Sequence, residues 1–130
     1  MAKSKATKMK EISLATKQEV LDRQESRSIT GVYLTPYNTT FHHVMERGAE
    51  SGVGLAYNII ALTFDEHRAY HDHQDIMVNG RKRYTWLEFE IIMKNYLKLQ
   101  YHGWNEDACR IHKYWEIKDY WKAIGIERDK

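Results

Sequence analysis

The sequence predicts an α+β fold, and three observations lead to this class. Residues 28–44 are rich in threonine, tyrosine, valine and isoleucine, which favour extended strands. Residues 58–62, Asn-Ile-Ile-Ala-Leu, are mostly apolar and indicate a short buried strand. Two Thr-x-x-Glu patterns, at Thr63 and Thr85, are typical of helix N-termini, where the two side chains satisfy free backbone amides. Strands and helices are therefore both expected in this chain.

The first element expected in chain order is a short amphipathic helix from Ser13 to about Gln24. Its apolar residues are spaced for one helical face, and Ser13 is a favourable N-cap. Residues 35–38, Thr-Pro-Tyr-Asn, predict a turn between two extended segments. Residues 48–57 contain three glycines and predict a loop before the strand at 58–62.

The helix that begins at Thr85 carries the clearest pattern. Its apolar residues recur at spacings of three and four, so one face is expected to be buried. They are Phe89, Ile92, Met93, Tyr96 and Leu97. Before this helix, Asn79-Gly80 predicts the turn of a short hairpin or loop. After it, Asn105 is a candidate cap for one or two further helices whose aromatic residues would dock on the core.

The length of 130 residues fits one domain with a modest core. We divide the chain into a flexible basic tail at residues 1–11 and a single domain at 12–130. Within that domain we place the core at 28–75 and a helical part at 85–125.

The formal net charge of +2 is too small to indicate nucleic-acid binding by itself. Its distribution is more informative, because four lysines precede the first acidic residue, Glu11. A second basic cluster consists of Arg81, Lys82 and Arg83. Such clusters are either simply solvated or in contact with phosphate, and the sequence leaves both interpretations open.

A single cysteine, Cys109, excludes an intrachain disulfide and a Cys-rich zinc knuckle. It is compatible with a reducing compartment. No apolar run is long enough for a secretory signal or a membrane span. We therefore expect a soluble cytoplasmic protein with no membrane partner.

The histidines are the feature around which the chain is organised. Five of the seven lie between residues 41 and 73. His42 and His43 are adjacent, whereas His67 and His71 are four residues apart and would share one face of a helix. Two imidazoles on one helical face are a common way to hold a divalent metal ion, so the spacing predicts a metal site.

This order of residues resembles the HNH endonuclease family, including its small phage-encoded members. Relatives with structural zinc carry His, a Gly-rich loop and then Asn-x-x-x-Leu-Cys-x-x-Cys-His-x-x-x-His. Asn58, Leu62, His67 and His71 keep that register, and the loop at 52–54 is similar to the family's loop. The resemblance implies a ββα-metal core, a two-stranded hairpin packed on one helix around a metal ion, here flanked by N- and C-terminal helices.

The resemblance also implies a role for each residue of the motif. His43 would be the general base that deprotonates water, and Asn58 would tie the loop to the strand and so orient that base. The metal ligands would be His42, His67 and His71, around one divalent ion such as Mg, Mn, Ni or Zn. Alternation along a strand supports this division, because consecutive side chains point to opposite faces. His42 and His43 are therefore not expected to bind the same ion.

The zinc cysteines of the family are all absent. Their positions correspond to Ser28, Gly31, Thr63 and Glu66. We expect the Thr63–Glu66 capping box to fix the helix start in place of zinc, a contribution of roughly 0.5–2 kcal/mol. Ordinary packing would replace the rest, and the candidate side chains are Tyr33, Leu34, Tyr37 and Phe41. No structural zinc is expected.

The activity implied is metal-dependent hydrolysis of DNA phosphodiester bonds, in the processing or packaging of bacteriophage DNA. The compartment would then be the cytoplasm of a bacterial host. Arg47 is a candidate phosphate clamp, with a solvated arginine as the alternative, and the basic cluster at 81–83 is a second candidate DNA contact. A homodimer or phage packaging proteins are the protein partners that this context implies.

Two other functions remain open from the sequence. One is a catalytically silent HNH-fold module that binds DNA or another protein. The complete set of motif histidines with Asn58 argues against it, because a binding module needs no base beside a metal site. The other is a His-rich binder of transition metals, which would give Asn58 and the glycine loop no purpose and would prefer zinc, nickel or copper to magnesium.

Overall fold

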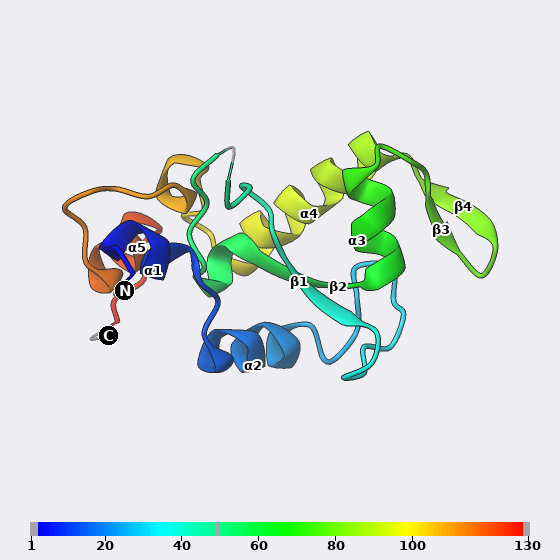
Figure 1. Cartoon of the computed structure of the whole chain (residues 1–130), viewed down its shortest axis with the longest axis horizontal. Helices are drawn as coiled ribbons and strands as arrows, with labels where there is room; N and C mark the ends of the chain where they lie inside the picture. The colour runs from blue at the N-terminus through cyan, green and yellow to red at the C-terminus, as the bar shows by residue number, and fades with distance from the viewer. Residues whose placement is uncertain (1–2, 49, 129–130) are drawn as a thin grey trace.

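Two small antiparallel hairpins and the helices around them form an α+β structure, which confirms the predicted class (Figure 1). The computed structural model describes residues 3–48 and 50–128. Within these residues, no helix is both long and apolar enough to cross a bilayer.

The first hairpin lies at the centre of the molecule. Strand β1 (Thr39–His43) pairs antiparallel with β2 (Ile59–Thr63), so that Thr39 faces Thr63 and His43 faces Ile59. Helix α3 (Phe64–His71) begins directly after β2 and packs on both strands. Four of the five residues of β2 are buried, as expected of a strand covered on both faces.

The predicted starts of three helices are confirmed. Ser13 caps α2 (Leu14–Arg23), accepting a hydrogen bond from the Thr16 amide. Thr63 and Thr85 form complete capping boxes at α3 and at α4 (Trp86–Gln100). On α4 the buried residues are Phe89, Met93 and Leu97, which belong to the face predicted from their spacing.

The turns are also where the sequence predicts them. The Asn38 amide donates to the Thr35 carbonyl oxygen at 3.3 Å, which closes the turn before β1. Asn79 and Gly80 adopt positive φ angles of 53° and 75° between β3 (Ile76–Val78) and β4 (Arg81–Tyr84). This second hairpin extends away from the rest of the molecule at one end (Figure 1).

The strand after the glycine loop begins one residue later than predicted. Residues Ala56–Asn58 form a short 3₁₀ helix, η1, and β2 starts at Ile59. The cause is the backbone amide of Asn58, which donates to the Leu55 carbonyl oxygen at 2.8 Å and so closes the 3₁₀ turn.

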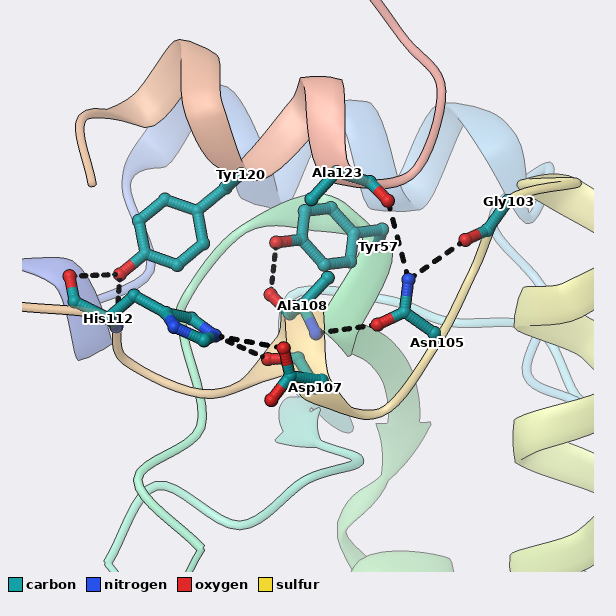
Figure 2. Close-up of polar contacts among 8 residues, drawn as sticks. All are labelled: Tyr57, Gly103, Asn105, Asp107, Ala108, His112, Tyr120 and Ala123. Atoms are coloured by element: carbon teal, nitrogen blue, oxygen red, sulfur yellow. Dashed lines mark hydrogen bonds and ion pairs between the residues drawn. The ribbon is translucent and has the colours of Figure 1, made fainter.

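The C-terminal part packs against this 3₁₀ turn (Figure 2). The 3₁₀ helix η2 (Asp107–Cys109) has Glu106 as its N-cap residue, and the preceding Asn105 supports it because its Oδ1 accepts from the Ala108 amide at 2.9 Å. The Tyr57 hydroxyl donates to the Ala108 carbonyl oxygen, joining η1 to η2. The last helix, α5 (Ile117–Ala123), buries Tyr120 and Trp121. The sequence predicts one or two further helices with aromatic residues docked on the core, and α5 is such a helix.

The N-terminal segment departs from the expected flexible tail. Residues Lys5–Lys10 form helix α1, which Ser4 caps by accepting from the Thr7 amide. The Gly54 amide donates to the Met9 carbonyl oxygen at 2.8 Å, and Met9 packs against the core. Docking of main chain on main chain thus orders a segment whose composition is that of a solvated tail. Residues 1 and 2 of the expected tail lie outside the described residues.

A polar network stands where the family's zinc cysteines would be. Glu66 is buried, at 3% exposure, and its Oε1 accepts from the Thr63 amide at 2.8 Å. Its other oxygen, Oε2, accepts from the Ser28 hydroxyl at 3.0 Å and from the Thr30 hydroxyl. One carboxylate therefore both starts α3 and anchors the 28–31 turn to it.

The side-chain packing that was expected to replace the zinc is present only in part. Leu34 is buried and Phe41 is half-buried, but Tyr33 and Tyr37 are 63% and 91% exposed. The two tyrosines are not needed to fill this region, because hydrogen bonds to Glu66 already join the turn to the helix.

Replacing Glu66 by alanine should therefore destabilise the protein more than the loss of a helix cap alone. The change removes the capping box and leaves the Ser28 and Thr30 hydroxyls without their buried acceptor, a cost of about 2–4 kcal/mol. The loss is measured as the change in the free energy of unfolding in a urea titration. Glu88→Ala is the matched control, because Glu88 makes the same capping box at the exposed start of α4. Equal losses in the two variants would contradict the network's role.

Candidate metal centre

Three of the predicted site residues converge at the junction of β1 and α3. His42 comes from the strand, and His67 and His71 come from the helix, with one ring nitrogen of each within 4.8 Å of the others. Nε2 of His67 lies 3.2 Å from Nδ1 of His42 and 2.9 Å from Nε2 of His71. His42 is buried, His67 half-buried and His71 exposed, so the cluster opens to solvent on one side.

The local structure explains why the three rings meet. Alternation along β1 turns His42 towards α3, and the spacing of four places His67 and His71 on the helical face that covers the strand. The His42 ring also packs edge-on against Tyr70, with ring centroids 5.2 Å apart. The predicted metal ligands are therefore brought together by the packing of α3 on the hairpin.

The three rings are better arranged to coordinate an ion than to hydrogen-bond to one another. A neutral imidazole has one N–H and one free lone pair, so Nε2 of His67 cannot form good hydrogen bonds to both of its neighbours. An ion at the centre would accept all three lone pairs. Nitrogens about 2.0–2.1 Å from a tetrahedral ion are roughly 3.3 Å apart. The distances from Nε2 of His67 to its two neighbours, 3.2 and 2.9 Å, are close to this value.

A second observation indicates that packing alone does not explain a histidine at position 42. Its second ring nitrogen, Nε2, is buried and has no hydrogen-bond partner among the described residues. An unsatisfied buried donor or acceptor costs about 1–3 kcal/mol. An ion bound to Nδ1 would leave Nε2 unpaired, so the contribution of Nδ1 to the cluster has to offset this cost.

The environment holds these imidazoles in the form that binds metal. Burial, with smaller contributions from His67 and His71, keeps the pKa of His42 well below the usual 6.5. Burial, followed by the charges of His71 and His43, lowers the pKa of His67 to about 4. Both rings are therefore neutral at pH 7 and need to lose no proton when an ion binds.

Thr40 is a functional candidate that the sequence analysis missed. Its hydroxyl oxygen lies 3.2 Å from Nδ1 of His67. If Nε2 of His67 faces an ion, Nδ1 carries the proton and donates to Thr40, which fixes the tautomer and the ring. The available signal was the spacing of two between Thr40 and His42, which places both side chains on one face of the strand.

His43 lies apart from the cluster, as alternation along the strand predicts. It is half-buried and lines an open cleft of about 610 Å³, whose other lining residues are Glu11, Ile12, Lys17, Thr39, Thr40, Phe41 and Arg47. Its Nε2 is 2.8 Å from the Lys10 carbonyl oxygen. Burial lowers the pKa of His43, the Lys10 carbonyl opposes this shift and Arg47 reinforces it. Thr40 lines the cleft and also contacts His67, so cleft and cluster are neighbours.

Asn58 is fully buried and joins the two ends of the glycine loop. Its Oδ1 accepts from the Met45 amide at 2.8 Å, and its Nδ2 donates to the carbonyl oxygens of Val53 at 2.8 Å and Met45 at 3.1 Å. Gly52 is required beside it, because a Cβ there would lie 1.7 Å from the Met45 carbonyl oxygen. The loop after His43 is thus fixed by one amide side chain.

The four basic residues predicted to contact phosphate lie in two different parts of the structure. Arg47 is exposed and lines the same cleft as His43. Arg81, Lys82 and Arg83 are exposed on β4 and do not line this cleft. Lys17 of α2, which the sequence analysis did not single out, supplies the second cation of the cleft.

No family model matches the chain, and neither does any curated protein or solved structure. The geometry of the histidine cluster and its cleft is therefore the basis for a functional conclusion.

Metal titration should separate ligands from neighbours. Calorimetry with Zn²⁺ or Ni²⁺ should show a loss of about 100-fold or more in affinity for His42→Ala, His67→Ala or His71→Ala, because each removes one of three donors. Thr40→Val should weaken binding by about tenfold, since it frees the His67 ring. His43→Ala should bind as the wild type does. Unchanged affinity in the three ligand variants would exclude a metal centre here.

The metal-free protein should lose stability as the pH falls from about 6.5 to about 4. In this window the unfolded chain takes up protons at His67, whereas the folded protein does not, because its pKa there is about 4. The free energy of unfolding, followed by urea titration with a chelator present, should therefore be highest above pH 6.5. His67→Gln should reduce this slope without abolishing it, because the pKa values of His42 and His43 are lowered too. His102→Gln, at an exposed position, should leave the slope unchanged. A protein that gains stability on acidification would contradict the buried neutral form.

Proposed function

We propose that this protein is a divalent-metal-dependent DNA endonuclease of the HNH, or ββα-metal, kind. The observation that carries the proposal is the convergence of His42, His67 and His71 next to a cleft that contains His43. A metal-binding protein without catalytic activity would need the first feature but not the second.

The arrangement of the elements supports the same conclusion. β1, β2 and α3 follow one another as hairpin and helix, and the cluster lies where the helix covers the hairpin. This is the topology that the family resemblance implies. The Glu66 network supports a member without structural zinc, because it joins the 28–31 turn to α3 by hydrogen bonds.

The chemistry divides between the two faces of β1. A divalent ion held by the three imidazoles would polarise the scissile phosphate and stabilise the charge that develops on it. On the cleft side, Nδ1 of His43 would take the proton from the attacking water. Arg47 and Lys17 would hold phosphate oxygens of the strand in the cleft. Asn58 would keep the loop after His43 in place and so preserve this geometry.

The charges of the cleft favour a polyanionic substrate. Its lining contains two cations, Lys17 and Arg47, against one carboxylate, Glu11, which pairs with Lys3. The exposed basic residues of β4 would extend the phosphate contacts along a longer nucleic acid.

The deciding experiment is conversion of supercoiled plasmid to nicked or linear DNA with Mg²⁺, Mn²⁺, Ni²⁺ or Zn²⁺. We expect cleavage that requires added metal and that falls by about 10²–10⁴-fold in His43→Ala, which removes the base. Zn²⁺ binding by that variant, measured in parallel, should be retained. His102→Ala serves as a histidine control outside the site. If metal-loaded wild type leaves both plasmid and single-stranded DNA uncut, the nuclease proposal fails, and a catalytically silent module that binds DNA or another protein becomes the better hypothesis.

A further inference from the structure

The N-terminal segment meets the candidate site through backbone atoms. The Lys10 carbonyl oxygen, at the end of α1, lies 2.8 Å from Nε2 of His43. One residue earlier, the Met9 carbonyl oxygen accepts from the Gly54 amide at 2.8 Å. One and two residues later, Glu11 and Ile12 line the cleft that contains His43. Four consecutive residues of this segment therefore border the motif.

The contact with Lys10 determines which nitrogen of His43 carries the proton. A carbonyl oxygen only accepts hydrogen bonds, so Nε2 of His43 must be the donor. In the neutral ring the free lone pair is then on Nδ1. This nitrogen has no hydrogen-bond partner among the described residues, and it is not a buried unsatisfied atom. It is therefore in contact with solvent, and the ring that carries it lines the cleft.

We propose that the backbone carbonyl of Lys10 is a positioning group for His43, which holds the ring as its Nε2–H tautomer and presents Nδ1 to the cleft as the base. The backbone that carries the Lys10 carbonyl then supports the base, without a role for the side chains of this segment. This inference rests on the proposed nuclease function and adds to it a group that no side-chain motif reveals.

Gly54 shows how closely the segment is fitted to the loop. A Cβ at position 54 would lie 2.1 Å from the Glu11 carbonyl oxygen and 2.8 Å from that of Lys10. Both neighbours are backbone atoms, so they cannot move aside without displacing the segment. Gly54→Ala should push the Lys10 carbonyl away from His43. It should leave His42, His67 and His71 in place, since none of them touches this segment.

Glu11→Pro is a second way to change the direction of the Lys10 carbonyl, because it alters the backbone directly after Lys10. Glu11 has a φ of −73°, which proline adopts without strain. Proline disfavours the helical conformation of the residue before it, here Lys10, and it removes the Glu11 amide that donates to the Lys8 carbonyl oxygen. The direction of the Lys10 carbonyl should change while the core, to which α1 contributes no fully buried residue, keeps its structure.

Each variant has a matched control. Gly48→Ala adds the same methyl group in the same loop region, where a Cβ would meet nothing within 4 Å. Glu11→Ala removes the carboxylate, with its ion pair to Lys3, but leaves the backbone free to keep its path. Thermal unfolding and Zn²⁺ affinity, measured for all four variants, establish that the fold and the histidine cluster are retained.

Two readouts test the positioning role. Nitrogen-15 NMR of the His43 ring, in metal-free and Zn²⁺-loaded protein, should show the Nε2–H tautomer in the wild type and in both controls. Gly54→Ala and Glu11→Pro should show a mixture of tautomers. In plasmid cleavage the same two variants should lose about 10- to 100-fold in kcat with KM within about twofold, because a misoriented base slows chemistry and not binding.

The outcomes distinguish this inference from the function on which it rests. A wild type that leaves DNA uncut contradicts the nuclease proposal. An active wild type overturns the role of Lys10 alone if His43 is found as the Nδ1–H tautomer, or if both variants keep kcat and the tautomer. Faster cleavage by the variants would also overturn it, because the segment would then obstruct the base.

Discussion

The register of β1 against β2 is the constraint on which the site depends. Side chains alternate along a strand, so a slip of one residue would turn His43 towards α3 and His42 towards the cleft. Asn58 extends the pairing beyond the strands, because its carbonyl oxygen accepts from the Val44 amide and its Oδ1 accepts from the Met45 amide, each at 2.8 Å. A buried asparagine therefore fixes both the loop and the faces to which the two histidines point.

A second constraint is the position of α3, on which His67 and His71 depend. Glu66 fixes the start of this helix through the Thr63 amide and binds the 28–31 turn through Ser28. A carboxylate has acceptor sites for several donors at once, which allows one side chain to join two segments. In the resembling family, zinc and four thiolates would perform this task. The hydrogen-bonded version needs no metal, and it leaves the histidine cluster as the site available to an ion.

Features encoded locally were predictable from the sequence, and those made by distant backbone atoms were not. The capping boxes at Thr63 and Thr85 involve residues three apart, and the spacing of His67 and His71 refers to one helix. The bond from His43 to Lys10 joins residues 33 positions apart, and the docking of α1 joins Gly54 to Met9. Both contacts use a backbone carbonyl group, which every residue possesses. No side-chain pattern marks such a contact. The link from Ser28 to Glu66 is intermediate, since the resemblance to the HNH family indicates both positions but not their hydrogen bond.

The two faces of β1 also separate two electrostatic tasks. The cluster offers three imidazoles, neutral at pH 7 at least for His42 and His67, so a bound divalent ion would keep its full charge for a phosphate oxygen. Nitrogen donors of this kind suit zinc, nickel or copper better than magnesium, which prefers oxygen ligands. A base placed among these rings would compete with them for the ion. His43 avoids that competition by facing the opposite side of the strand, where a carbonyl group holds its Nε2 and leaves Nδ1 free.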